Sequence, residues 1–562
     1  MSQSPGGASW TTWPMAGLGA LLLWMAFPPL DWWPLAWLAP VPWVWLVRRR
    51  QLAGRRPYVA LTVAGFAFWM GALHWLRLPH PATSIGWVAL SFYFAFYLPV
   101  FVGLSRVAVH RLRVPVMLAA PVVWTGLELA RAHLLTGMSM ASLAHTQYRW
   151  IELIQVSDLA GEFGVSFVVM CVAAALARML PCDDRPWAIW PLAPAAGVLA
   201  AVLGYGYLRT AHEVTSPGPR VALIQGSVDI ELMSAADPQE RRRMADQRDD
   251  YTYRQYLRLS EEAVEKYPRV DVVVWPESMF PWTLVTFDAN ATRPAEYGGS
   301  EAQFRADLQQ AADSDRWTMA RLAEKLGTAL ILGVATEHFG AHDDCVYCSA
   351  AYVSHEGRLM GRYDKNHLVM FGEYMPLVDR FPWLQHFTPL TGNATPGNKV
   401  VAFEAGGVCM APSICYESVL SHVIRRQVNA LAAEGKQPQV LINLTNDGWF
   451  WGSSELDMHL ACGVFRAVEC RKPFLIAANT GFSAWIDGDG RIRKKGRRRQ
   501  TDILLAEVRL DHRGSWYLRH GDWFAGICLV ACLAFAAAYW FPAVPARRRW
   551  HSSSSSSKAA CT

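Results

Sequence analysis

The sequence has few charged residues and lacks the signatures of nucleotide and metal enzymes. Only 18% of its 562 residues are charged, whereas a soluble globular protein carries about a quarter, and 52% are hydrophobic. It contains no Walker A string, no dinucleotide fingerprint and no convincing metal-ligand cluster. We therefore expect a membrane protein without a cofactor or a metal. The net charge of +6 is mild, so the placement of the basic residues is more informative than their number.

Long apolar segments dominate the first 208 residues. Because a spanning helix needs about 20 apolar residues, we expect spans near 13–28, 32–47, 58–76, 85–109, 114–130, 162–180, 187–208 and 523–545. The first two are short, and "FPPLDWWPLAW" also fits a tight turn between two short helices. The first span lacks a small-residue cleavage site and is expected to be a retained helix.

Basic residues mark one side of the expected membrane. The alternate loops contain chiefly Arg77, Arg131 and Arg149. The loops after the second, fourth, sixth and last spans hold Arg48, Arg49, Arg50, Arg55, Arg56, Arg111, Arg113, Arg178, Arg185, Arg547, Arg548 and Arg549. The positive-inside rule then predicts cytoplasmic termini and an extracytoplasmic block between the last two spans.

The expected organisation has four parts. They are N-terminal transmembrane helices over 1–212 (about seven spans), a catalytic domain over 217–515, a C-terminal span over 520–546 and a disordered tail over 547–562. In the second part, apolar strands such as 220–228, 270–278 and 328–336 alternate with helices, which is typical of a layered α/β domain. Strand pairs without helices, at 348–368 and 474–492, argue against a simple doubly wound sheet.

Four reactive side chains lie at the ends of these strands. They are Glu277, Lys365, Glu373 and Cys415. A cysteine nucleophile needs a base, and a carboxylate can be that base when apolar surroundings raise its pKa. A lysine and a backbone N–H, here that of Tyr416, can hold the oxyanion of a tetrahedral intermediate. Each residue alone is more often structural, but their occurrence at consecutive element ends favours one shared site.

The remaining cysteines give weaker signals. The pair Cys345-x-x-Cys348 has no second pair to complete a metal site, so we interpret both as small residues near a strand. Cys462 and Cys470 lie eight residues apart in an expected helix and are interpreted as packing residues.

The order Glu, Lys, Cys resembles the triad of the nitrilase superfamily. The strings "VVVWPES", "GRYDKNHLVMFGEYMPL", "ICYES" and "NLTNDGWF" resemble the bacterial apolipoprotein N-acyltransferase family, as does the layout of spans around an outer domain. The resemblance implies a multi-pass α-helical membrane domain and an extracytoplasmic α/β nitrilase-like domain, an α-β-β-α sandwich. It covers nearly the whole chain up to about residue 545.

The resemblance also implies roles for individual residues. Cys415 would be the acyl-accepting nucleophile, Glu277 the general base and acid, and Lys365 the group that stabilises the oxyanion and the thiolate. Glu373 would position or tune Lys365, while Glu417 would support the site beside Tyr416. Apolar loops such as 446–451, with Trp449 and Phe450 as expected cleft residues, could keep water from a thioester.

The implied reaction is a ping-pong acyl transfer in bacterial lipoprotein maturation. A phospholipid, by analogy phosphatidylethanolamine, would give its acyl chain to Cys415, and the α-amine of a diacylglyceryl-cysteine would take it. The implied enzyme is a monomer of the bacterial inner membrane, with its catalytic domain on the periplasmic side and no nucleic acid partner. Two departures from the family are Cys348, where an asparagine is usual, and the polar segment 285–316, which we interpret as an inserted loop over the site.

Two alternatives remain open. A membrane-tethered nitrilase-type amidase would use the same residues but pass the acyl group to water. A transporter with an outer binding domain would carry intramembrane charges and internal repeats, yet only Glu128 stands out and no repeat is evident. Polyprenyl sugar transfer is unsupported, because no nucleotide-sugar domain is visible.

Overall fold

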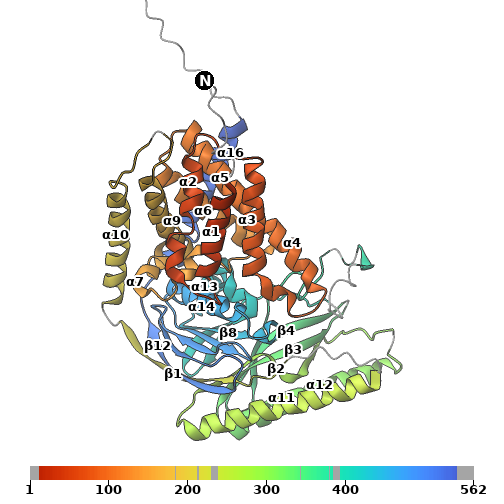
Figure 1. Cartoon of the computed structure of the whole chain (residues 1–562). Coiled ribbons are helices and arrows are strands. Elements are labelled where there is room, and N and C mark those ends of the chain that lie inside the picture. The colour runs from red at the N-terminus through yellow and green to blue at the C-terminus, as the bar shows by residue number, and fades with distance from the viewer. Residues whose placement is uncertain are drawn as a thin grey trace, which may run out of the picture.

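An apolar helical bundle lies against an α/β domain in this computed structural model (Figure 1). The structure describes residues 12–183, 185–211, 214–229, 238–295, 297–341, 343–376, 378, 380–383 and 393–540. The expected tail over 547–562 lies outside these residues.

The helical bundle is formed by the N-terminal helices and one helix that returns from the end of the chain. In chain order its longer helices are α1 (Thr12–Ala26), α2 (Val41–Arg48), α3 (Pro57–Ala72), α4 (Thr83–Ala95), α5 (Tyr97–Arg106), α6 (Val116–His133), α9 (Glu162–Met179), α10 (Leu192–Thr210) and α16 (Trp523–Trp540). A Cβ atom at Gly126 of α6 would lie 2.8 Å from the carbonyl oxygen of Cys528, so a glycine is needed where α16 packs on α6.

Among the described residues, four helical segments are long and apolar enough to cross a membrane. They are Thr83–Arg111, Glu162–Met179, Leu192–Thr210 and Trp523–Trp540, and the helices Thr12–Ala26 and Pro57–Ala72 are apolar but shorter. The segment 32–47 is not one continuous helix. That segment forms a 3-10 turn, Trp33–Trp37, followed by the eight-residue α2, because Pro34, Pro40 and Pro42 cannot donate backbone hydrogen bonds inside a longer helix. The alternative of a tight turn between short helices is confirmed.

Two six-stranded sheets form the centre of the α/β domain. The first has the order β12-β1-β2-β3-β4-β5 and the second β11-β10-β9-β8-β7-β6, and each combines three parallel strands with antiparallel neighbours. The strands of the first sheet are β1 (Thr215–Gln225), β2 (Val272–Phe287), β3 (Ala329–Phe339), β4 (Asp344–Val353), β5 (Leu359–Asp364) and β12 (Asp502–Asp511). Those of the second are β6 (Phe403–Ala405), β7 (Val408–Ile414), β8 (Val440–Thr445), β9 (Phe474–Ala478), β10 (Ala484–Ile486) and β11 (Ile492–Lys495).

Two helical layers cover the sheets. Apolar residues such as Val274 and Ile442 pack between the two sheets. Helices α11 (Pro238–Lys266) and α12 (Glu301–Leu326) cover the outer face of the first sheet, and α13 (Ser421–Ala433) and α14 (Glu455–Cys470) cover that of the second. The expected α-β-β-α sandwich is confirmed. In Figure 1, α13 and α14 lie between the second sheet and the helical bundle, whereas α11 and α12 lie on the far side.

The segment 285–316 is not a loop over the site. Its first residues continue β2, and from Glu301 it forms the first half of α12 on the side away from the bundle (Figure 1). Phe304, Leu308 and Ala312 recur at helical spacing and are buried, and the Ser300 hydroxyl caps the helix by accepting from the Gln303 amide. The sequence analysis missed this part of the helix because the residues between the apolar positions are polar.

Buried ion pairs join the bundle to the α/β domain. Arg466 of α14 donates to Glu162 at the start of α9 (2.7 Å), and Arg471 donates to Asp158 (2.6 Å). All four side chains are almost fully inaccessible to solvent. The second sheet and its helices are therefore fixed directly against the bundle.

Candidate active site

Glu277, Lys365 and Glu373 form one cluster beside the first sheet, in which Glu277 and Lys365 are buried and Glu373 is partly exposed. The Lys365 ammonium lies 3.2 Å from Glu277 Oε1 and 2.7 Å from Glu373 Oε1, and only 1% of this lysine is exposed. Lys365 follows β5, and its amide donates to the Cys348 carbonyl of β4. The structure thus brings together the three ionisable residues that the sequence placed at separate element ends.

The backbone around Glu277 is displaced from regular pairing. The ladder between β2 and β3 is interrupted between Trp275 and Phe280, where Pro276 cannot donate a hydrogen bond. A Cβ at Gly333 of β3 would lie 2.6 Å from the Glu277 Cα, so only glycine permits this approach. At this interruption the Glu277 side chain reaches the Lys365 ammonium.

Cys415 begins a tight 3-10 turn directly after β7. Its φ of +49° lies in the left-handed region, which costs a non-glycine residue about 1–3 kcal/mol and is common at functional sites. The Asn443 side-chain amide donates to the Cys415 carbonyl at 3.1 Å, and the Ser418 hydroxyl lies at the same distance. Neighbouring side chains therefore maintain a strained turn at the cysteine.

Charges surround the thiol of Cys415. Burial raises its pKa well above the ordinary value, the carboxylate of Glu277 acts in the same direction, and the ammonium of Lys365 opposes both. Burial lowers the pKa of Lys365, but Glu277 and Glu373 outweigh it and leave that pKa well above normal. The site thus contains a neutral thiol and a charged lysine between two carboxylates, so the thiol needs a base to become a nucleophile.

Glu417 connects the cysteine turn to the loop that follows β5. Its fully buried carboxylate accepts from the Tyr363 hydroxyl (2.8 Å) and from the amides of Asn366 (2.8 Å), His367 (3.0 Å) and Ile414 (2.7 Å). Burial raises the pKa of Glu417, while these hydrogen bonds oppose that shift. One side chain therefore fixes the loop from the first sheet against the end of β7.

Tyr416 and Phe450 face the helical bundle. The Tyr416 hydroxyl donates to the Gly137 carbonyl at 2.8 Å, and the Phe450 ring packs edge-on against Trp75 with 5.0 Å between ring centres. Trp449 and Phe450 belong to a short 3-10 turn, Asp447–Phe450, and both are half-buried. The cysteine turn therefore lies at the junction with the bundle; the roles of these aromatic residues in a substrate cleft remain predictions.

The sequence interpretation missed two contacts of Glu277. The Cys348 sulfur lies 3.4 Å from Glu277 Oε1, and the Asn446 amide donates to Oε2 at 3.0 Å. Both Glu277 oxygens are thus occupied. The sequence does single out Cys348, because it stands where the resembled family has asparagine. Its contact with Glu277, however, depends on the register of β4. Cys462 and Cys470 are free and buried, which confirms them as packing residues.

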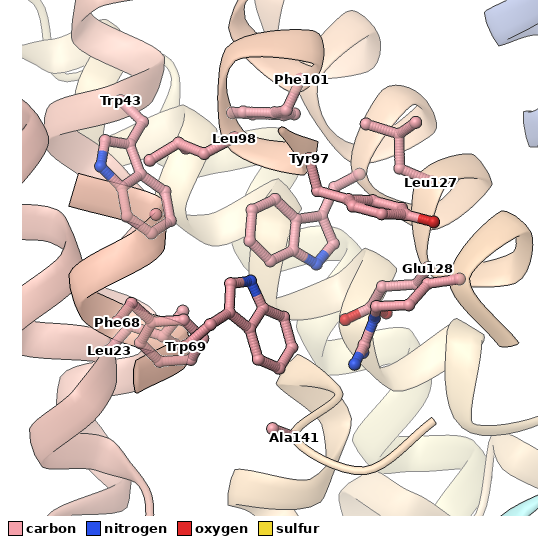
Figure 2. Close-up of a pocket in the computed structure, with 13 residues that line it drawn as sticks. Leu23, Trp43, Phe68, Trp69, Tyr97, Leu98, Phe101, Leu127, Glu128 and Ala141 are labelled. Atoms are coloured by element: carbon pink, nitrogen blue, oxygen red, sulfur yellow. The ribbon is translucent and has the colours of Figure 1, made fainter. Parts of the chain in front are cut away.

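A mostly apolar cavity lies within the helical bundle. Figure 2 shows aromatic and aliphatic side chains facing one another across it, with Glu128 at one side. Arg131 also lines it and lies over the Trp69 ring, 5.1 Å from its centre. The bundle also contacts the end of the cysteine turn. The Ser139 hydroxyl donates to the Val419 carbonyl at 2.8 Å. The bundle thus contains apolar space near the site.

Comparison with known families agrees with this architecture. Residues 19–175 match the apolipoprotein N-acyltransferase N-terminal domain, and residues 220–517 match the carbon-nitrogen hydrolase family. An apolipoprotein N-acyltransferase of Rhodopirellula baltica is 32% identical, with 94% of this chain and 97% of the relative covered. The chain belongs to the apolipoprotein N-acyltransferase family. A second member, from Geobacter metallireducens, is also 32% identical over 93% of this chain and 94% of its own.

Membership in the apolipoprotein N-acyltransferase family confirms the expected enzyme class, an acyltransferase with a membrane-embedded helical region and a nitrilase-like domain. Among solved structures, an amidase from Nesterenkonia is similar to the α/β domain. It is 18% identical, the match covers 55% of this chain and 96% of the amidase, and the TM-score is 0.32.

Proposed function

We propose that this protein N-acylates the N-terminal diacylglyceryl-cysteine of apolipoproteins with an acyl chain taken from a phospholipid. The observation that carries the proposal is the position of the cluster. Cys415, beside Glu277 and Lys365, lies on a turn whose next residue, Tyr416, contacts the membrane-embedded bundle. Both substrates are lipids held in a bilayer, so a site at this junction suits them.

In the first half-reaction, Glu277 takes the Cys415 thiol proton and the thiolate attacks the ester carbonyl of the phospholipid. Lys365 and the backbone amide of Tyr416 stabilise the oxyanion of the tetrahedral intermediate. The C–O bond then breaks, Glu277 returns the proton to the departing alcohol, and a lysophospholipid leaves. The acyl chain remains on Cys415 as a thioester, with Glu277 again a carboxylate and Glu373 holding Lys365 in place.

In the second half-reaction, the α-amine of the diacylglyceryl-cysteine attacks the thioester carbonyl. Glu277 accepts a proton from the nitrogen as the C–N bond forms and donates it to the Cys415 sulfur as the C–S bond breaks. The thioester preserves acyl reactivity between two bulky substrates that need not bind together. The products are an amide and the original thiol.

The proposal includes the donor, the location and the oligomeric state. By family analogy the donor is phosphatidylethanolamine, and the enzyme acts as a monomer. The basic loops predict cytoplasmic termini, which would place residues 217–515 on the periplasmic side of the inner membrane. The four-part division of the chain, with about seven N-terminal spans, belongs to the same proposal. The aromatic residues Trp449 and Phe450 would shield the thioester.

The acceptor distinguishes transfer from amidase chemistry. Purified full-length protein would be mixed with phosphatidylethanolamine and a diacylglyceryl-cysteine peptide, beside Cys415→Ala, and the products identified by mass spectrometry. We expect the peptide to gain one acyl chain with wild type and none with the variant. Release of free fatty acid without acylated peptide would overturn the proposal in favour of a membrane-tethered amidase.

A further inference from the structure

A second buried cluster lies behind the cysteine turn. It contains Asp447 of the 3-10 turn after β8 and two residues of α14, Glu455 and His459, each 3% exposed. His459 Nδ1 lies 3.2 Å from Asp447 Oδ1 and 3.9 Å from Glu455 Oε1. One potential ligand atom from each residue lies within 4.8 Å of the others. Glu455 and His459 are four residues apart, so successive turns of α14 direct them to one point.

One carboxylate of this cluster is incompletely satisfied. Glu455 Oε2 is buried without a hydrogen-bond partner. Within the described part of the chain, no lysine or arginine forms an ion pair with Asp447 or Glu455; His459 is the single basic side chain near them. Asp447 Oδ1 accepts from the Thr445 hydroxyl at 2.7 Å, so the unsatisfied carboxylate is that of Glu455. A buried carboxylate oxygen without a partner is costly, and beside a second carboxylate and an imidazole it favours the binding of a cation. The other oxygen of the same carboxyl, Oε1, faces His459, so the unsatisfied group belongs to a side chain that enters the cluster.

We propose that Asp447, Glu455 and His459 bind one divalent transition-metal cation such as Zn²⁺. One imidazole nitrogen and two carboxylates are ligands that this class of ion accepts, and the imidazole favours it over Mg²⁺ or Ca²⁺. Full burial between the second sheet and the bundle fits a structural ion. None of the three residues belongs to the Glu277–Lys365–Cys415 cluster, so the inference does not depend on the proposed acyl transfer.

A hydrogen-bonded path connects this site to Cys415. His459 Nε2 lies 2.7 Å from the Ser418 hydroxyl, which lies 3.1 Å from the Cys415 carbonyl. A cation on Nδ1 leaves the histidine proton on Nε2, where it donates to Ser418. Ser418 must then donate its own proton to Cys415 O. The cation would thereby fix one hydrogen-bond arrangement at the strained cysteine turn.

The test counts metal ions and requires no substrate. Full-length protein in detergent would be stripped with a chelator, dialysed against micromolar Zn²⁺ and analysed by plasma mass spectrometry. We expect about one equivalent in wild type and less than about a tenth in Glu455→Gln. Asp457→Asn is the matched control: it removes an acidic residue from the same helical turn, one that pairs with Arg498 outside the cluster, and should bind like wild type.

Two results would overturn the proposal. Wild-type protein with less than about a tenth of an equivalent would have no such site, whatever the variants do. Equal metal in wild type and Glu455→Gln would place the ion elsewhere. If Glu455→Gln does not elute as folded protein, His459→Gln replaces it, and Zn²⁺ should raise the melting temperature of wild type and Asp457→Asn but not of this variant.

Discussion

The reactivity of Cys415 follows from the charges around one thiol. Burial and Glu277 keep its pKa well above the ordinary value, so the free enzyme holds a thiol that is deprotonated only when a base acts on it. Lys365 is the single cation among the groups that act most strongly on it. These charges therefore predict that the Cys415 thiol reacts slowly with general thiol reagents at neutral pH.

Alkylation of Cys415 by iodoacetamide should report this pKa. Because the thiolate is the reactive form and the pKa is raised, the rate should still be rising above about pH 9, whereas a free thiol levels off after its pKa of about 8.5. Lys365→Met removes the opposing positive charge and should slow alkylation further. Peptide mass spectrometry gives the site-specific rate, with a short unstructured cysteine peptide in the same buffers as the reference. A plateau by about pH 8 would contradict this account.

Glu417 should matter more for stability than its neighbours in the site. Glu417→Gln replaces one acceptor oxygen with an amide that faces backbone donors, so we expect a loss of about 1–3 kcal/mol in the free energy of unfolding. Tyr363→Phe removes one donor and should cost about 1 kcal/mol. Thermal unfolding of both variants in the same detergent provides the comparison. A Glu417→Gln variant as stable as wild type would show that this carboxylate does not fix the loop.

At the scale of elements, the packing of α6 on α16 depends on one missing side chain. A Cβ at Gly126 would lie 2.7 Å from the Cys532 sulfur and 2.8 Å from a backbone oxygen, so Gly126→Ala should lower stability by about 1–3 kcal/mol. Gly86→Ala in α4 is the control, because its Cβ would have no atom within 4 Å. The melting temperatures of the two variants test this prediction. Equal melting temperatures would mean that α6 and α16 accommodate the added methyl group without a loss of stability.

Sequence predicted the elements well where apolar spacing was regular and less well where prolines or polar residues intervened. Most strands of the two sheets could be placed, and the reactive residues lie at their ends. A continuous helix over 32–47 does not form because its prolines interrupt the backbone hydrogen bonds, which apolar content alone does not reveal. The contact between Cys348 and Glu277 required the register of β2, β3 and β4, and the cluster around His459 required the position of α14 relative to β8; neither is encoded locally.

At the scale of the molecule, buried ion pairs between the bundle and the α/β domain should hold the site at their junction. Glu162→Gln leaves Arg466 with one fewer buried carboxylate partner, and removing one member of a buried pair costs about 3–5 kcal/mol. Asp250→Asn, in an exposed pair on α11, should cost about 0–1 kcal/mol. Thermal unfolding of the full chain measures both, and similar losses would refute a special role for the interface.

The central claim is that Cys415 carries an acyl chain, and intact mass spectrometry tests it most directly. Wild type and Cys415→Ser would be incubated with phosphatidylethanolamine and no acceptor, with folding checked by elution. The account predicts one acyl mass on wild type, removed by hydroxylamine, and no hydroxylamine-labile adduct on the variant. Folded wild-type protein that gains no acyl mass in the presence of the lipid would contradict it.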